Sequence, residues 1–365
     1  MVRTVLGIYR RAYDGLPKEI WLLSGALFIN RFGTMVLPFL TLYLTSEMGY
    51  EESAAGRMLS VYGVGSICGA YLSGRLVKSL GAIRLQILLL FLSVPAFLAV
   101  PLFDSWLGIA ASLFLLSFFT EGVRPANATA VTQYAPVHLR VRAFGLQRMA
   151  VNLGISFGPA IGGVLATINF VWLFVADAGT TLLCALALLY FFGFKPDPVE
   201  DAAHSDNDGQ VATGSPAGDP LYLLFLGLIL LTSIVFFQIH ATYPLYLTEH
   251  YGMTKPLIGL IYAVNTVVIV VIEMVLLNFV RRWSMTSVIG WGAFLSCLGF
   301  GMLPFGTSGS YCVLSMLVIT LGEMLWMPLA SGWIAHRSDR GNRGLYMGWY
   351  AMTFSIAAIV APACG

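Results

Sequence analysis

Leu42-Tyr43-Leu44-Thr45 in the first half of this chain recurs 203 positions later as Leu245-Tyr246-Leu247-Thr248. The same offset relates further pairs of identical residues without a gap: Gly49 and Gly252, Gly56 and Gly259, Pro125 and Pro328, Arg140 and Arg343, Gly145 and Gly348, Pro159 and Pro362, and Gly162 and Gly365. A constant offset over more than 100 residues predicts a duplicated unit, and such a repeat determines the fold.

The composition indicates that lipid surrounds most of this repeat. The chain is 58% hydrophobic and 10% charged, whereas a soluble domain has about 25% charged residues. The five cysteines are scattered without a C-x-x-C pair, which favours apolar filling over a metal or redox centre. The sequence has no catalytic motif and no phosphate-binding loop. The sequence therefore predicts that the protein is not an enzyme and uses no cofactor. We expect an ion gradient to supply its energy.

Eleven apolar runs are long enough to cross a bilayer, which takes about 20 residues. They cover 20–46, 54–77, 82–102, 105–134, 141–168, 171–194, 220–248, 256–280, 285–305, 309–335 and 344–365. Lysine and arginine gather at alternate turns, around Arg75, Arg140, Arg281 and Arg337. Because positive residues favour the cytoplasmic side, we expect a cytoplasmic N-terminus in a bacterial inner membrane.

The repeat divides the chain into residues 1–194, an acidic linker at 195–219 and residues 220–365. The linker composition predicts a mobile cytoplasmic segment. Gly365 is equivalent to Gly162, which lies inside the fifth run, so we expect the sequence to stop within an eleventh helix of an expected twelve. Six spans per half give both halves one orientation, as in parallel repeats of transporters.

The fifth run contains Gly154-x-x-x-Gly158-Pro159-x-x-Gly162-Gly163. Glycines at this spacing make a flat strip that another backbone can approach, and a proline bends the helix. The chain resembles the major facilitator superfamily over its whole length, and this motif is similar to that superfamily's fifth-helix antiporter motif. We expect the strip to pack against the other half. Plain tight packing is the alternative interpretation.

The turn after the second run reads Gly74-Arg75-Leu76-Val77-Lys78-Ser79-Leu80-Gly81-Ala82-Ile83-Arg84. It resembles the superfamily's Gly-x-Leu-x-Asp-Arg-x-Gly-Arg loop in the spacing of Gly74 and Gly81 and in Arg84. Lys78 takes the place of the acid that the family uses in its inward gate. The resemblance implies a gating role, and topological anchoring by positive charge is the alternative.

Shorter motifs narrow the resemblance. Asn30-Arg31-Phe32 lacks the carboxylates of the Glu-x-x-Glu-Arg-Phe motif of proton-coupled peptide transporters, which argues against peptide symport. Arg124-Pro125-Ala126-Asn127 and Gly322-Glu323-Met324, together with the fifth-run motif, resemble the multidrug-resistance efflux branch of the superfamily.

Charged residues within the runs are functional candidates, because each costs about 2.5–3.5 kcal/mol at mid-membrane. The resemblance implies that runs one, four, seven and ten line the transport cavity. Substrate candidates on these runs are Asn30, Arg31, Arg124, Gln238 and His240, and proton-coupling candidates are Glu323 and Glu121. Glu273 lies about two turns from Arg281 and is a candidate for a gate pair.

Two of these residues, Glu121 and His240, also have simpler structural interpretations. Glu121 could form a static pair with Arg124 or Arg148 that takes up no proton. His240 could form a hydrogen bond between helices.

The sequence therefore predicts an all-α membrane protein with a major-facilitator-type two-bundle fold. We expect a monomeric secondary active transporter that works by alternating access and exports small amphipathic molecules in exchange for protons. Its partners are a small-molecule substrate, protons and lipid, without nucleic acid or metal. The alternatives are a proton symporter or uniporter for a nutrient and, from another class, a non-transporting receptor or scaffold.

Overall fold

A computed structural model describes residues 7, 11–193, 214–240, 242–339 and 341–364, and these ranges are helical apart from short connections and an isolated bridge at Ser338. Most of the predicted linker lies outside the described residues. The helices of the first half are α2 (Lys18–Phe32), α3 (Val36–Leu42), η1 (Tyr43–Glu47), α4 (Glu52–Leu80), α5 (Ala82–Ala99), η2 (Val100–Leu102), α6 (Trp106–Tyr134), η3 (Val137–Leu139), α7 (Arg140–Ile168) and α8 (Val171–Phe192). Those of the second half are η5 (Pro216–Gly218), α9 (Pro220–Phe237), η6 (Gln238–His240), α10 (Thr242–Tyr251), α11 (Lys255–Val280), α12 (Met285–Gly301), η7 (Leu303–Phe305), α13 (Gly309–Arg337) and α14 (Arg343–Cys364).

Nine helical segments within the described ranges are long and apolar enough to cross a membrane. The predicted runs 54–77 and 285–305 do not reach this standard. The helix over the first, α4, is rich in glycine and serine and carries Arg57, Arg75 and Lys78, while α12 has 17 residues. The predicted class of all-helical, multi-pass membrane protein is confirmed, and the predicted count of eleven spans is not.

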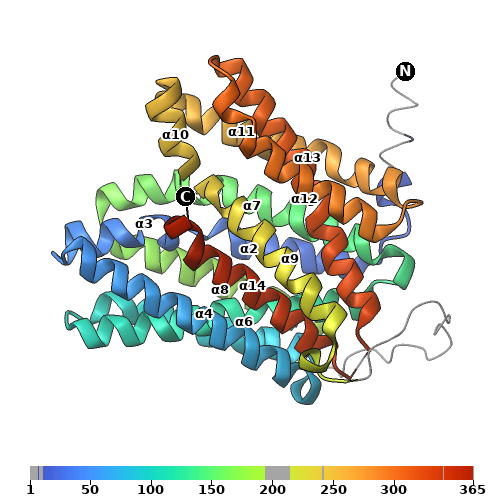
Figure 1. The fold of residues 1–365 in the computed structure, drawn as a ribbon. Helices are drawn as coiled ribbons and strands as arrows, with labels where there is room; N and C mark the ends of the chain where they lie inside the picture. The colour runs from blue at the N-terminus through green and yellow to red at the C-terminus, as the bar shows by residue number, and fades with distance from the viewer. Residues whose placement is uncertain (1–6, 8–10, 194–213, 241, 340, 365) are drawn as a thin grey trace.

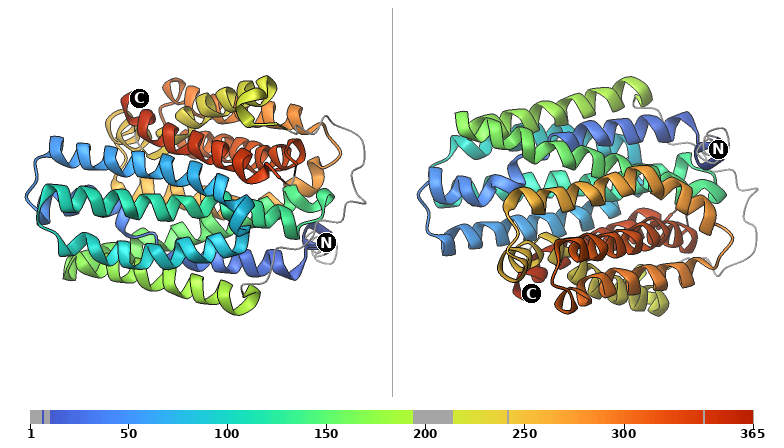
Figure 2. Two further views of the ribbon diagram at one scale, coloured as in Figure 1. Left: turned by 90° about the horizontal axis from the view of Figure 1, so that it is seen from below. Right: turned by 90° about the horizontal axis from the view of Figure 1, so that it is seen from above.

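The helix boundaries follow the repeat. Shifting α6 by 203 positions gives the bounds of α13, and shifting Arg140, the first residue of α7, gives Arg343, the first residue of α14. Equivalent N-cap residues also recur, because the side chains of Ser105 and Ser308 each accept a backbone N–H in the first turn of α6 and α13. Figures 1 and 2 show α2–α8 and α9–α14 as two bundles that lie side by side.

We call the end of the molecule where α8 stops and α9 begins the linker end. The turns at Gly81, between α6 and α7, between α11 and α12 and between α13 and α14 lie at this end, because neighbouring helices alternate in direction. Gly81 has φ +84°, a conformation that glycine adopts without strain, and this permits the abrupt turn from α4 into α5.

The two halves pack together through α4 against α14 and through α7 against α11 and α13. Glycines bring α4 and α14 close at the linker end, where a Cβ on Gly74 would lie 2.7 Å from the carbonyl oxygen of Gly344. Nearby, Arg140 Nη1 donates to the carbonyl of Ala335 at 3.4 Å, and Gly332 leaves room for Val141. The linker end is therefore closed between the halves.

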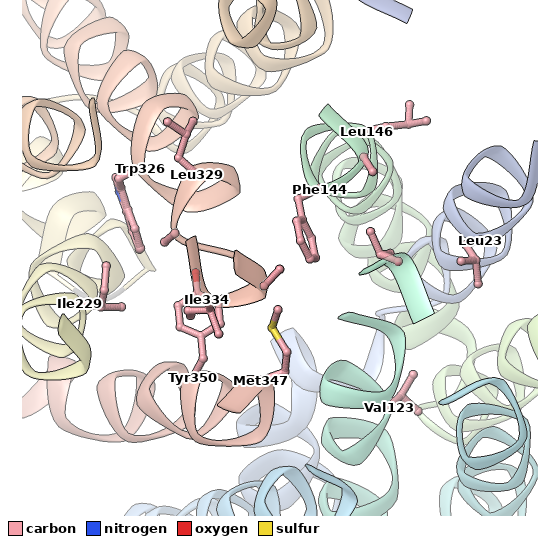
Figure 3. Close-up of a cluster of buried hydrophobic side chains, with 14 of the residues drawn as sticks. Leu23, Val123, Phe144, Leu146, Ile229, Trp326, Leu329, Ile334, Met347 and Tyr350 are labelled. Carbon is pink, nitrogen blue, oxygen red and sulfur yellow. The ribbon is translucent and has the colours of Figure 1, made fainter. Parts of the chain in front are cut away.

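Buried apolar side chains fill much of the remaining space within and between the bundles. Figure 3 shows part of this core, with Phe144 of α7 and Met347 of α14 pointing toward the same space from different halves. Trp326 on α13 is fully buried against Phe236 of α9. This packing fixes the helices that carry the charged residues described next.

Candidate functional site: a buried ion network between the two halves

Arg148 on α7 lies between two glutamates of the other half. Its Nε donates to Oε1 of Glu273 on α11 at 2.7 Å, and its Nη1 donates to Oε1 of Glu323 on α13 at 2.7 Å. The side chain of Arg148 is 10% exposed, that of Glu323 is 6% and that of Glu273 is 0%. These two ion pairs join the N-terminal half to the C-terminal half inside the protein.

Neutral neighbours complete the network on the C-terminal side. Asn265 Nδ2 donates to Glu323 Oε2 at 3.1 Å and to Thr320 Oγ1 at 2.9 Å. Asn265 and Glu273 are eight positions apart on α11, which places them on one face, and Thr320 precedes Glu323 by one turn of α13. Two helices thus present their polar faces to a single arginine.

The charges of the network do not balance. One guanidinium faces two carboxylates, and Arg148 Nη2 and Glu273 Oε2 are buried without a hydrogen-bond partner in the described structure. Removing one partner of a buried ion pair costs about 3–5 kcal/mol, because the charge left behind is uncompensated. One bound proton would bring the three groups to neutrality.

A second polar group lies within the N-terminal half. Arg124 Nη1 is 3.2 Å from Glu121 Oε2 on α6, as the static-pair interpretation of Glu121 supposed. Arg31 on α2 has a buried Nε without a hydrogen-bond partner among the described residues. Arg31, Asn30 and Glu121 line a cavity of about 60 Å³, and Asn30 Nδ2 donates to Thr181 Oγ1 at 3.3 Å.

The first span is broken beside this cavity. Asp177 on α8 accepts the backbone N–H groups of Met35 at 3.0 Å and Val36 at 3.1 Å, and these are the amides exposed where α3 begins. The carboxylate therefore supplies the acceptors that the interrupted helix lacks. The seventh span is interrupted at a near-equivalent position, between α9 and α10.

The predicted substrate residues do not line one cavity. Gln238 lines a separate cavity of about 440 Å³ and joins helices, since its Nε2 donates to the carbonyl of Ala361 at 2.7 Å and its Oε1 accepts from Thr242 at 2.8 Å. His240 is exposed next to Phe237, with ring centroids 6.4 Å apart. Neither side chain lines the cavity beside Arg31, and both residues lie in the helix break at η6, which periodicity could not predict.

The fifth-span glycines contact the first span of their own half, and the expectation that they pack against the other half is wrong. A Cβ on Gly154 would lie 2.8 Å from Arg31 Cβ, one on Gly158 would lie 2.7 Å from the carbonyl oxygen of Thr34, and one on Gly162 would lie 3.1 Å from Met35 Cβ. A Cβ on Gly163 would lie 3.6 Å from Phe39 Cζ. Pro159 lies within α7, and its side chain is outside the described set. The strip accommodates the broken first span, whose backbone needs the space.

Contacts of α7 with the other half come from a different face. Gly145 lies against Leu277, and Ser156 Oγ donates to Thr266 Oγ1 at 3.1 Å, both on α11. Most of the segment predicted as the turn after the second span is helical. Gly74 lies within α4 and makes the close contact with α14, Lys78 is exposed near the end of α4, and Arg84 lies in the first turn of α5.

The sequence indicates Glu323 as a proton-coupling candidate and Arg281 as a gate partner of Glu273. The structure supplies Arg148 to both, and neither this pairing nor the role of Asn265 was foreseen. Counting the charged residues in the middle of the spans could have indicated this pairing. Glu273 and Glu323 give the C-terminal half two carboxylates, which need a cation from another helix. Over the described residues, no group of three or more His, Cys, Asp or Glu side chains could hold a metal ion.

Comparison with known proteins identifies a family with this architecture. Residues 23–362 match the family model described as Major Facilitator Superfamily. The chain is 24% identical over 355 residues to the uncharacterized MFS-type transporter YttB of Bacillus subtilis (strain 168), which covers 96% of this chain and 88% of that protein. It is 23% identical over 348 residues to Multidrug resistance protein 1 of the same organism, with 93% and 86% covered.

The fold is also similar to a solved structure. The crystal structure of a bacterial homologue of the iron transporter ferroportin in an outward-facing state superposes with a TM-score of 0.71 at 16% identity, covering 95% of this chain and 91% of that one. At this identity the similarity concerns the fold alone.

Proposed function

This chain belongs to the major facilitator superfamily, and on that premise we propose that it exports small amphipathic molecules in exchange for protons by alternating access. The family and its relatives indicate a transporter rather than an enzyme. The observation that carries the proposal is the buried network in which Arg148 of one half binds Glu273 and Glu323 of the other. The similarity to Multidrug resistance protein 1 supports export.

In this proposal the network is both a tie between the halves and the proton site. Opening of the linker end requires Arg148 to separate from both glutamates, because it belongs to the other bundle. A proton bound by the glutamate pair neutralises one carboxylate and leaves Arg148 with one ionic partner. Because the two carboxylates share one cation, the proton is a property of the pair rather than of either residue. Protonation therefore weakens the tie.

The direction of transport follows from which end of the molecule faces the cytoplasm and which faces the outside. We place the linker end in the cytoplasm, as the lysine and arginine distribution predicts. With the linker end closed, a proton enters the network from the outer side, and the weakened tie allows the linker end to open. Substrate then binds from the cytoplasm while the proton leaves, and the ionised network closes again.

The energy available is sufficient for export. One elementary charge that moves through 100 mV provides about 2.3 kcal/mol. Since about 1.4 kcal/mol corresponds to a tenfold ratio, each proton supports a substrate gradient of roughly fortyfold.

The test is proton-driven transport by the full chain in vesicles with an imposed pH gradient, with an acid-sensitive dye inside to follow substrate-dependent proton movement. Glu323→Gln and Glu273→Gln each mimic a permanently protonated network, so proton movement should stop while exchange of substrate persists. Glu121→Gln is the matched control, because Glu121 pairs with Arg124 outside the network. Proton-coupled transport that survives both network variants but is lost in Glu121→Gln would place the proton site in the N-terminal half.

A further inference from the structure

A cavity of about 200 Å³ lies between the two halves, next to the ion network. Helices α6 and α7 form one wall, and α13 and α14 form the other. The lining residues are Arg124, Ala128, Phe144, Arg148, Met327, Pro328, Ser331, Met347, Tyr350, Ala351 and Phe354. None of the substrate candidates on the first and seventh spans is among them.

The charge of this lining has one sign. Arg124 and Arg148 are the charged residues among the described side chains that line it, and no carboxylate lines it. The side chain of Arg148 is nine-tenths buried, yet its Nη2 has no hydrogen-bond partner in the described structure after Nε and Nη1 have bound the two glutamates. Arg124 is 40% exposed on the side chain and uses Nη1 toward Glu121. Arg124 therefore offers exposed donors to a ligand, and Arg148 keeps one donor without a protein acceptor beside the same cavity.

The remaining lining is apolar and held in place. Phe354 stacks on the buried Trp326 with ring centroids 6.0 Å apart and an interplanar angle of 7°, and Tyr350 meets Phe354 edge-on at 5.0 Å. Tyr350 lines the cavity together with Arg124 and Arg148. On the opposite wall Phe144 points toward Met347 (Figure 3). A flat apolar group would meet aromatic faces and thioethers at little cost in side-chain ordering.

We propose that this cavity binds amphipathic organic anions, in which one carboxylate or sulfonate is attached to a flat apolar body. The anionic group accepts from Arg148 Nη2 and from Arg124, and the body lies against Phe144 and Phe354. An amphipathic cation would find no carboxylate among the described lining residues, because the acids that pair with Arg124 and Arg148 lie outside the lining. The proposal rests on the proposed transport function and adds to it the chemical class of the substrate.

The cavity beside Arg31 does not offer the same site. Its volume is about 60 Å³, and Glu121 and Asp177 line it together with Arg31. An anion there would face two carboxylates and would have no room for an apolar body.

Equilibrium binding to the full chain in lipid nanodiscs tests the proposal with three radiolabelled probes of one shape, namely 2-naphthoate, 2-naphthamide and 2-naphthylmethylammonium. We expect naphthoate to bind roughly tenfold or more tightly than the other two, because hydrogen bonds to charged groups contribute about 1.5–3 kcal/mol. Arg124→Gln should weaken naphthoate binding by roughly tenfold and leave naphthamide unchanged, while Arg124→Lys should retain most of the affinity. Arg57→Gln, an exposed arginine outside the cavity, should change neither.

A second variant tests the position of the binding site without changing its charge. Ser331→Phe places a ring in the cavity and should abolish binding of both naphthoate and naphthamide. Equal binding of the three probes, tighter binding of the ammonium probe, or naphthoate binding that ignores both Arg124→Gln and Ser331→Phe would overturn the proposal. Binding at equilibrium needs neither proton flow nor alternating access, so such a result leaves the vesicle test of proton coupling unaffected. Loss of proton coupling with anion binding intact would count against the proposed function alone.

Discussion

At the scale of single residues, charged side chains lie where two segments of the chain must be held together. Asp219, just before the second half begins, accepts from Arg337 Nε and Nη2, both at 2.8 Å, and from Tyr346 Oη at 3.1 Å. Its carboxylate also caps α9 through the backbone N–H of Tyr222 at 3.1 Å. One acid thus fixes α9, α13 and α14 at the linker end.

This cluster predicts a pH dependence of stability. The hydrogen bonds from Arg337 hold the pKa of Asp219 below its ordinary value of 3.8, against the opposing effect of burial. Because the folded-state pKa is lowered, the stabilisation is present above the ordinary pKa and is lost as the pH falls through the folded-state pKa. Asp219→Asn should therefore reduce the free energy of unfolding in detergent at pH 7 by about 1–3 kcal/mol, which a lower Tm would report. The difference in Tm from the natural chain should shrink below pH 3.8.

The matched control for this prediction is Asp104→Asn, which removes an exposed acid at the opposite end of the molecule. Its Tm should follow that of the natural chain at every pH. If Asp219→Asn and Asp104→Asn gave the same Tm at pH 7, the Arg337 pair would contribute nothing to stability.

The glycines of the fifth span also act at residue scale. A Cβ on Gly158 would lie 2.7 Å from the carbonyl oxygen of Thr34, a backbone atom that cannot move aside easily. Gly158→Ala should destabilise the protein by about 1–3 kcal/mol, the usual cost of overpacking, as measured by Tm. Gly179→Ala, in a helix with nothing within 4 Å of the added methyl, should be neutral or stabilising. Equal effects of the two would show that α7 does not need this close approach to the first span.

At the scale of elements, α4 and α14 form the contact that must slide or separate when the molecule changes state. Ser66 and Ser355 are hydrogen bonded at 2.7 Å midway along it, and Gly74, Gly344 and Gly348 bring the backbones together at the linker end. These contacts join separate bundles, so a substitution here acts on the equilibrium between states more than on the packing of either bundle.

Gly74→Ala is the corresponding prediction. The added methyl would lie 2.7 Å from Gly344 O and 2.9 Å from Gly348 Cα, which disfavours the closed linker end. A single cysteine at Val77, buried in this contact, should then react faster with a maleimide in solubilised protein. Gly56→Ala, on the same helix with open space around it, should leave the rate unchanged. An unchanged rate in Gly74→Ala would mean that the contact yields without opening.

At the scale of the whole molecule, the sequence was most informative where the repeat and the apolar runs set the helices. Residues such as Pro125 and Pro328 already fixed the correspondence of α6 and α13. The pairing of Arg148 with Glu273 and Glu323 could not be predicted, because it depends on how three helices from two halves meet. The same holds for the glycine strip, since periodicity gives a face of α7 but not the neighbour that the face contacts.

The central claim is that protonation of the Glu273–Glu323 pair weakens its tie to Arg148 and allows the linker end to open. The most direct measurement is the distance between spin labels at Ser79 and Ser284, exposed linker-end residues of different halves, in protein without its native cysteines. We predict a longer distance at pH 5 than at pH 8, and in the double variant Glu273→Gln, Glu323→Gln the longer distance at both pH values. A natural chain whose distance does not change with pH, or a double variant that stays closed, would contradict the account.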